Sequence, residues 1–240
     1  GNFPSHASVE ACNMPEFSGL DEIIENEEWI EILSKVELQG DSQNKFKISS
    51  SSSFTHLRLH IYPDGGVARF RVYGNPEIPD TSDNELKDFA LSDNGGEMIS
   101  CSDMHFSHMG NLIKPTPGVD MSDGWETKRR RDPGPDWSIV KLAATGSVRK
   151  VIIDTCHFKG NFPDTFTLEG LVSNSDDFTN GQQEEKWQPI IERTKLYAHR
   201  EHLFINEIVP ASTEQFTHLR LNIFPDGGIS RMRVFGKRDV

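Results

Sequence analysis

The feature that most constrains the fold of this chain is a stretch of about twenty residues that occurs twice. Residues 55–74 read THLRLHIYPDGGVARFRVYG, and residues 217–236 read THLRLNIFPDGGISRMRVFG. Self-similarity over so long a separation indicates a duplicated domain rather than a solenoid of short repeats. We therefore expect two related domains in the 240 residues.

Each copy has the pattern of two strands joined by a tight loop. In the second copy apolar and polar residues alternate over 219–223, a Pro-Asp-Gly-Gly loop follows at 225–228, and the alternation resumes over 231–234. This pattern predicts a β-hairpin whose loop fixes the pairing register. In that register Arg220 lies directly opposite Arg233, and the first copy places two arginines in the same way.

Two arginines opposite each other in a ladder repel, at a cost of up to about 1 kcal/mol. An anion beside them would offset this repulsion. It could be an Asp or Glu side chain from a neighbouring strand. It could also be an anionic ligand, because the guanidinium fork matches a carboxylate in geometry. The pattern leaves both sources open.

Composition excludes several classes of partner. The net charge of −12 argues against nucleic acid and against anionic membrane surfaces. No apolar run approaches the length that spans a bilayer. The three cysteines are odd in number and far apart, which favours a reducing compartment. We expect a cytoplasmic protein, with the peroxisome as the alternative.

The sequence Gly-Asn-Phe-Pro occurs at residues 1–4 and again at residues 160–163, deep inside the second copy. Residues 97–159 thus have no counterpart in the first copy, and we expect the first repeat to be truncated. The predicted organisation is a partial first repeat at 1–80, a linker at 81–96 and a complete second repeat at 97–240.

Short strand-like stretches and long loops dominate both repeats, with almost no helical periodicity. This pattern indicates an all-β protein built from two tandem sandwiches. We expect jelly-roll domains of the galactose-binding-like kind, the first of them incomplete, because this topology presents loops for ligand binding at one end.

A basic run follows an aromatic turn in the second repeat. Residues 122–131 read SDGWETKRRR, the only run of four basic residues in an acidic chain. One interpretation is a solvated charge run beside a tethered core tryptophan. The other is an anion-binding loop, because binding residues concentrate on loops of a rigid scaffold.

An acid and a histidine stand three residues apart at the end of an apolar strand: residues 151–159 read VIIDTCHFK. Asp154 and His157 could form an oriented base or share a metal ion. Alternatively, Asp154 caps the strand and His157 is a partly buried packing residue.

These motifs together resemble the allantoicase family. The paired hairpin sequences, the segment Ser122–Arg131 and the segment Ile153–Asn161 carry the resemblance, which covers essentially the whole chain. It implies tandem jelly rolls, a homo-oligomer, and hydrolysis of allantoate to ureidoglycolate and urea in purine breakdown. The first repeat departs from the family because it lacks a DGW-type segment and an acid-His-Lys strand end.

Replacing a ureido group by hydroxyl needs a base for water, or a metal in that role, and an acid for the departing urea. We assign catalysis to Asp154, His157 and Glu126. Substrate binding is assigned to Trp125, Lys128, Arg129, Arg130, Lys159, Arg220, Arg231 and Arg233. No metal ligand is assigned, and a divalent metal stays open as a cofactor. The alternatives are a non-catalytic sandwich that binds a carboxylate or sugar, and an inactive fragment of the enzyme.

Overall fold

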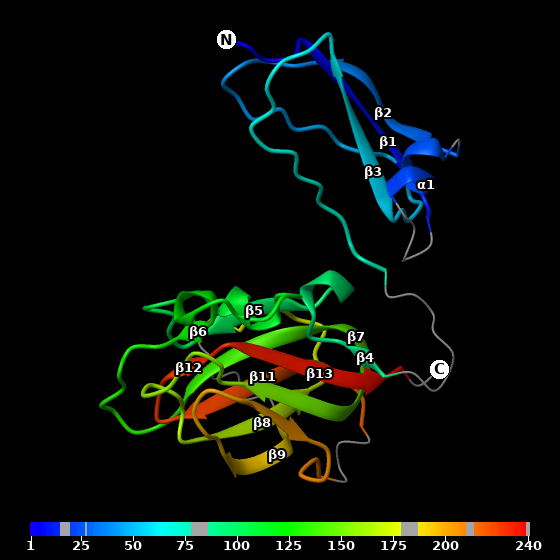
Figure 1. The fold of residues 1–240 in the computed structure, drawn as a ribbon. Coiled ribbons are helices and arrows are strands. Elements are labelled where there is room, and N and C mark those ends of the chain that lie inside the picture. Colours follow the sequence, from blue (N-terminus) through cyan, green and yellow to red (C-terminus); the bar gives the residue numbers. More distant parts are fainter. Residues whose placement is uncertain (15–19, 27, 78–85, 179–186, 210–213, 239–240) are drawn as a thin grey trace. The chain divides into compact units, whose positions relative to one another are not determined.

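The computed structural model describes residues 1–14, 20–26, 28–77, 86–178, 187–209 and 214–238 (Figure 1). The chain divides into two compact units, Gly1–Gly74 and Asn75–Val240. Among the described residues, no helix has the length and apolar character needed to cross a membrane.

Unit 1 contains a three-stranded antiparallel sheet in the order β2-β1-β3. Its strands are β1 (His6–Cys12), β2 (Ile30–Glu37) and β3 (His56–Tyr62), and a short helix α1 (Leu20–Glu25) lies between β1 and β2 in sequence. Strand β1 buries Ala7, Val9 and Ala11 on one face, as expected for alternating apolar residues in a strand.

Unit 2 is a two-layer β-sandwich with short strands at its periphery (Figure 1). Its longer strands are β5 (Glu97–Cys101), β7 (Asp136–Asp154), β8 (Thr165–Leu171), β9 (Gln188–Lys195), β10 (Glu201–Phe204), β11 (Phe216–Phe224) and β13 (Arg231–Lys237). The shorter elements are β4 (Lys87–Asp88), β6 (Trp125–Glu126), β12 (Gly228–Ile229) and the 3-10 turns η1 (Ser92–Asn94), η2 (Met109–Ile113) and η3 (Met121–Asp123). The all-β sandwich expected from the sequence is confirmed.

Strand β7 belongs to both layers. Its first half, up to Gly146, pairs with β5 and β11, and its second half pairs with β13 and β10. Strands β8 and β9 extend the first layer beyond β11, and β4 extends the second beyond β13. At the bend there is room only for glycine, because a Cβ on Gly146 would lie 2.4 Å from the ring of Phe89.

The predicted hairpin register is wrong. Strands β11 and β13 do not pair with each other, because each pairs with a different half of β7. Arg220 lies opposite Ile139 and Glu169, whereas Arg233 lies opposite Ile152. Alternation along a strand is a local signal, so it could not show that the loop at 225–230 crosses from one layer to the other.

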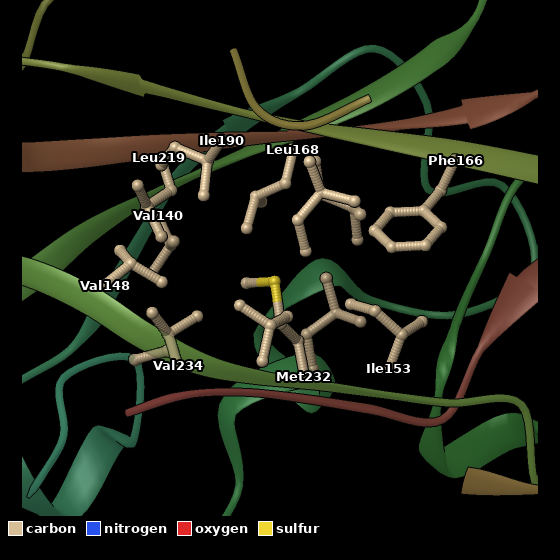
Figure 2. Close-up of a cluster of buried hydrophobic side chains, with 14 of the residues drawn as sticks. Val140, Val148, Ile153, Phe166, Leu168, Ile190, Leu219, Met232 and Val234 are labelled. Carbon is tan, nitrogen blue, oxygen red and sulfur yellow. The ribbon is translucent and has the colours of Figure 1, made fainter. Parts of the chain in front are cut away.

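The core fills the space between the two layers (Figure 2). Leu168 and Leu219 of the first layer point toward Met232 and Val234 of the second. All four side chains are at most 1% exposed. Burial of such side chains contributes roughly 1.5–3 kcal/mol each, and it fixes the ends of the strands that carry the candidate site.

Candidate functional site

One end of unit 2 gathers the segments that the sequence singled out. Strand β11 runs to this end beside Asp136, the first residue of β7. The last residue of β7, Asp154, lies at the same end, opposite Arg231 at the start of β13. Strands β6 and β12 pair there through Glu126 and Gly228 (Figure 1). Both ends of β7 and the 225–228 loop therefore surround one region.

A hydrogen bond to a backbone carbonyl orients the His157 ring in this region. Its Nε2 lies 2.9 Å from the carbonyl oxygen of Gly118. A carbonyl only accepts hydrogen bonds, so Nε2 is the donor, and in the neutral imidazole the lone pair is on Nδ1. The residue has a left-handed backbone (φ 72°) and its backbone N–H donates to Nδ1 of His199 over 2.8 Å.

Asp154 adopts the strand-capping role. The side chain is buried, and Oδ1 accepts a hydrogen bond from the backbone N–H of Cys156 at 2.7 Å. Its carbonyl oxygen accepts from the N–H of Ser230. Asp154 therefore shapes the turn that presents His157, and the His157 ring is oriented by Gly118 instead of by this carboxylate.

Glu126 is half-buried and bonds to a residue of the repeated GNFP motif. Its carboxylate accepts a hydrogen bond from the side-chain amide of Asn161. The same amide lies 3.8 Å from the sulfur of Met121, in the segment that also contains Gly118. Glu126 and His157 are thus connected through neighbouring loops at one end of the unit.

Trp125 is a core residue. Its side chain is 0% exposed, and its indole N–H donates to the carbonyl oxygen of Asp103 at 2.8 Å. The aromatic turn therefore matches the tethered-tryptophan interpretation, and Trp125 offers no surface to a substrate in this structure.

The basic run divides into exposed and engaged residues. Arg129 and Lys159 are exposed, and Lys128 has 67% of its side chain exposed while pairing loosely with Asp103 at 3.5 Å. Arg130 is engaged: its guanidinium bonds to the buried carboxylate of Asp136 at 2.9 Å. Lys128, Arg129 and Lys159 are the members of the set that remain accessible to an anion.

Arg231 tethers the loop that holds His157. It is 3% exposed and bonds to the carboxylate of Asp123 at 2.6 Å. Lys114 donates to the other oxygen of that carboxylate at 2.6 Å. Hydrogen bonds from Lys114 and Arg231 lower the pKa of Asp123 to about 2. The tether fixes residues 114–123, and with them the Gly118 carbonyl.

Arg220 and Arg233 also lie beside carboxylates of the protein. Arg220 bonds to Glu169 at 2.7 Å on the neighbouring strand β8. Arg233 lies 3.5 Å from Asp88, whose pKa is raised by burial. The sequence left open whether an acidic side chain or an anionic ligand accompanies these arginines. In the structure each lies beside an acidic side chain of a neighbouring strand. Arg220 and Arg233 lie in different layers and do not form one cationic face.

Three residues of this region were missed by reasoning from sequence: Gly118, Asn161 and His199. Asn161 carried a usable signal, because GNFP recurs at residues 1–4. Gly118 acts through its backbone carbonyl and His199 lies in an irregular segment, so neither has a side-chain pattern that periodicity could detect.

Comparison with known proteins identifies the family. The Allantoicase family model, described as an allantoicase repeat, matches residues 1–77 and 87–239. A probable allantoicase of Pseudomonas fluorescens (strain Pf0-1) is 49% identical over 240 residues, which cover 99% of this chain and 71% of the relative. A probable allantoicase of Photobacterium profundum is 46% identical over 98% of this chain and 71% of its own length.

Solved structures agree with the sequence comparison. The crystal structure of allantoicase from Saccharomyces cerevisiae matches with a TM-score of 0.71 and 34% identity, over 98% of this chain and 69% of that chain. A second allantoicase structure matches with a TM-score of 0.73 and 36% identity, over 99% and 69%. The resemblance inferred from the hairpin, SDGWETKRRR and IDTCHFKGN motifs is confirmed, and the chain belongs to the allantoicase family.

Proposed function

We propose that this chain hydrolyses allantoate to ureidoglycolate and urea, a step of purine breakdown. Family membership over almost the whole chain carries the proposal. Water adds oxygen to the central carbon, the bond from that carbon to one ureido nitrogen breaks, and the departing nitrogen takes up a proton. The reaction therefore needs a group that accepts a proton and a group that donates one.

His157 is the proposed proton acceptor. Its Nε2–H is held by the Gly118 carbonyl, so the lone pair on Nδ1 is available to a water molecule. Asp154 supports this role indirectly. Its carboxylate accepts the Cys156 N–H and so shapes the turn that presents His157. We therefore assign Asp154 to positioning and His157 to proton transfer.

Glu126 is the proposed partner of the leaving urea. Its carboxylate is held by the Asn161 amide, which fixes the carboxyl group at the same end of unit 2 as His157. A carboxyl group can deliver a proton to the departing nitrogen or bind the N–H groups of a ureido group. Both uses place Glu126 against the nitrogen side of the substrate.

The substrate carboxylate requires a cation, and Lys159 is our choice. It is exposed and follows His157 by two residues. Arg130, by contrast, neutralises Asp136, which is 3% exposed. Removing Arg130 would leave a buried charge unpaired, which is strongly destabilising. Arg130→Ala should therefore reduce stability, whereas Lys159→Ala should change substrate binding.

The test measures urea release from allantoate by the 240-residue chain. Stoichiometric urea and ureidoglycolate are expected, and Lys159→Ala should raise KM by about 10-fold or more, as expected for loss of a charge-assisted bond. Lys45→Ala in unit 1 is the matched control and should leave KM unchanged. Binding of allantoate without urea release would instead support a non-catalytic module.

We also propose that the chain forms a homo-oligomer in the cytoplasm, with the peroxisome as the alternative. This rests on the resemblance to the family and on the odd number of separated cysteines. Sedimentation equilibrium tests the assembly, and fractionation of the source cells tests the compartment.

A further inference from the structure

Cys156, His157 and His199 form a cluster of metal-binding side chains beside the end of β7. One donor atom from each residue lies within 4.8 Å of the donor atoms of the other two. The Cys156 sulfur and Nδ1 of His199 are 3.8 Å apart. In tetrahedral zinc sites a sulfur and a nitrogen ligand are about 3.6 Å apart, given the usual bond lengths. The Cys156–His199 pair is already close to that spacing, and the other pairs lie within 4.8 Å.

Two turns hold the cluster together. Thr155 accepts and donates hydrogen bonds with Arg200, and its hydroxyl donates to the Tyr197 carbonyl at 2.6 Å. The backbone N–H of His199 donates to the Phe158 carbonyl at 3.2 Å. These bonds join residues 155–158 to residues 197–200, so the donor atoms are brought together by backbone structure. Preorganisation of this kind reduces the entropy lost on binding.

The hydrogen bonds of the two imidazoles indicate which ring nitrogens could bind an ion. A metal-bound histidine usually donates its other ring N–H to a carboxylate or backbone carbonyl. His157 does this through Nε2 and the Gly118 carbonyl, which leaves Nδ1 for the ion. Nδ1 of His199 is also unprotonated, because it accepts the N–H of His157 over 2.8 Å. An ion on this atom would take the place of that hydrogen bond.

We propose that Cys156, His157 and His199 bind a thiophilic divalent cation of the zinc class. A thiolate and two imidazoles suit such an ion, and three protein ligands leave a fourth position open for water. Cys156 and His157 are half-buried and His199 is exposed, so an ion can reach the cluster. The site shares His157 with the proposed hydrolysis, because an ion on Nδ1 would occupy the lone pair assigned to the base.

The test is titration of the tag-free chain with Co²⁺ and Zn²⁺. One Co²⁺ per chain should bind and give the thiolate-to-cobalt charge-transfer absorption in the near ultraviolet. Cys156→Ser should abolish this absorption. Cys101→Ser is the matched control and should retain it, because burial raises the pKa of the Cys101 thiol to about 11 and disfavours the thiolate that a metal needs.

His199→Ala supplies a second arm. It should weaken Zn²⁺ binding by at least about 10-fold, the lower bound for losing even an outer-shell partner, and it should remove the rise in thermal midpoint that Zn²⁺ gives the unaltered chain. Absence of the absorption, or its persistence in Cys156→Ser, would overturn the proposal. So would unchanged Zn²⁺ affinity in His199→Ala.

Chelation separates this site from the proposed function. If allantoate hydrolysis falls after chelation and returns with Zn²⁺, the ion serves the reaction. Hydrolysis that persists in the metal-free chain would show that the reaction uses side chains alone, while the titration would still decide whether the ion binds. A chain that binds Co²⁺ but releases no urea would refute the hydrolysis and support the site.

Discussion

The sheet of unit 1 and the matching strands of unit 2 share their order and their main ion pair. Order β2-β1-β3 in unit 1 corresponds to β9-β8-β11 in unit 2. Arg58 bonds to Glu10 across β3 and β1, and Arg220 bonds to Glu169 across β11 and β8, each over 2.7 Å. The repeated sequence therefore forms the same strand order and the same Arg–Glu pair wherever both units have the corresponding partner strands.

The GNFP motif also has one role in both units. The N–H of Gly66 donates to the Asn2 carbonyl at 2.9 Å, and the N–H of Gly228 donates to the Asn161 carbonyl at 2.8 Å. The preceding glycine of each loop has a φ near 130°, a conformation that favours glycine. Each Pro-Asp-Gly-Gly loop is thus held by its own GNFP segment.

The two units differ after this loop. Residues 231–237 form β13 between β7 and β4, with Met232 1% exposed. In unit 1 the corresponding residues 69–74 form no strand, and Phe70 is 47% exposed. The described residues of unit 1 include no counterpart of β7. The sequence RxRV(Y/F)G therefore becomes a strand only where a partner strand pairs with it.

The largest expected difference between the units comes from Met232 and Phe70. Met232→Ala should lower the free energy of unfolding of unit 2 by about 2–5 kcal/mol, because it opens a cavity in the core. Phe70→Ala should change that of unit 1 by less than about 0.5 kcal/mol. Amide hydrogen exchange of β11 and β1 reports on the two units separately. Similar losses would show that residues 69–74 are packed.

A smaller difference is expected at the glycines of the loop. A Cβ on Gly228 would lie 1.9 Å from the Phe158 ring, whereas a Cβ on Gly66 would lie 3.4 Å from its nearest neighbour, the Asn2 carbonyl oxygen. Gly228→Ala should destabilise unit 2 by about 1–3 kcal/mol through overpacking. Gly66→Ala is the control and should cost less than about 1 kcal/mol. The same exchange measurement checks both, and equal costs would contradict the packing described around Phe158.

The two asparagines of the GNFP motifs provide a test in terms of activity. The Asn161 side chain donates to Glu126, whereas residues 1–74 contain no segment that matches the one with Glu126. Asn161→Ala should lower kcat by about 10-fold, because Glu126 loses its orientation but keeps its carboxyl group. Asn2→Ala should leave kcat unchanged. Steady-state urea release measures both, and equal effects would assign the asparagines a purely structural role.

The parts of the fold that could be predicted from the sequence are those that depend on residues close together in the chain. The alternation around Leu219 and Met232 correctly predicted two buried strands, and the acid beside Arg220 was one of the two expected anions. The register failed because β7, residues 136–154, pairs with both strands. No local pattern shows that a distant strand binds two neighbouring ones.

The same limit applies to the site. Asp154, His157 and Glu126 could be selected as candidates because acids, histidines and their spacing are visible in a sequence. Burial of Trp125 and the Gly118 hydrogen bond to His157 depend on loops folding back over the sandwich. Those contacts appear only once the chain is folded, so the sequence named the residues but not their contacts.

The smallest predicted effect concerns the stability of the two units at low pH. The low pKa of Asp123, about 2, contributes stability that is fully present above its ordinary pKa near 3.8 and is lost as the pH falls toward 2. Asp123→Asn should reduce the stability of unit 2 at neutral pH and flatten its loss between pH 4 and 2. In unit 1, hydrogen bonds from His60 and Arg58 likewise lower the pKa of Glu10, and Glu10→Gln is the matched change. Denaturation at a series of pH values measures the free energy of unfolding. If it falls as steeply between pH 4 and 2 in Asp123→Asn as in the unaltered chain, the proposed tether is contradicted.

The turnover number of His157→Ala is the most direct test of a catalytic site at this end of unit 2, because residues 1–74 contain no counterpart of His157. Loss of a general base should lower kcat for urea release by about 100-fold or more, with a smaller change in KM. His60→Ala in unit 1, where the imidazole pairs with Glu10 at 2.6 Å, is the control and should retain full turnover. An unchanged kcat in a folded His157→Ala chain would contradict a catalytic site at this end of unit 2.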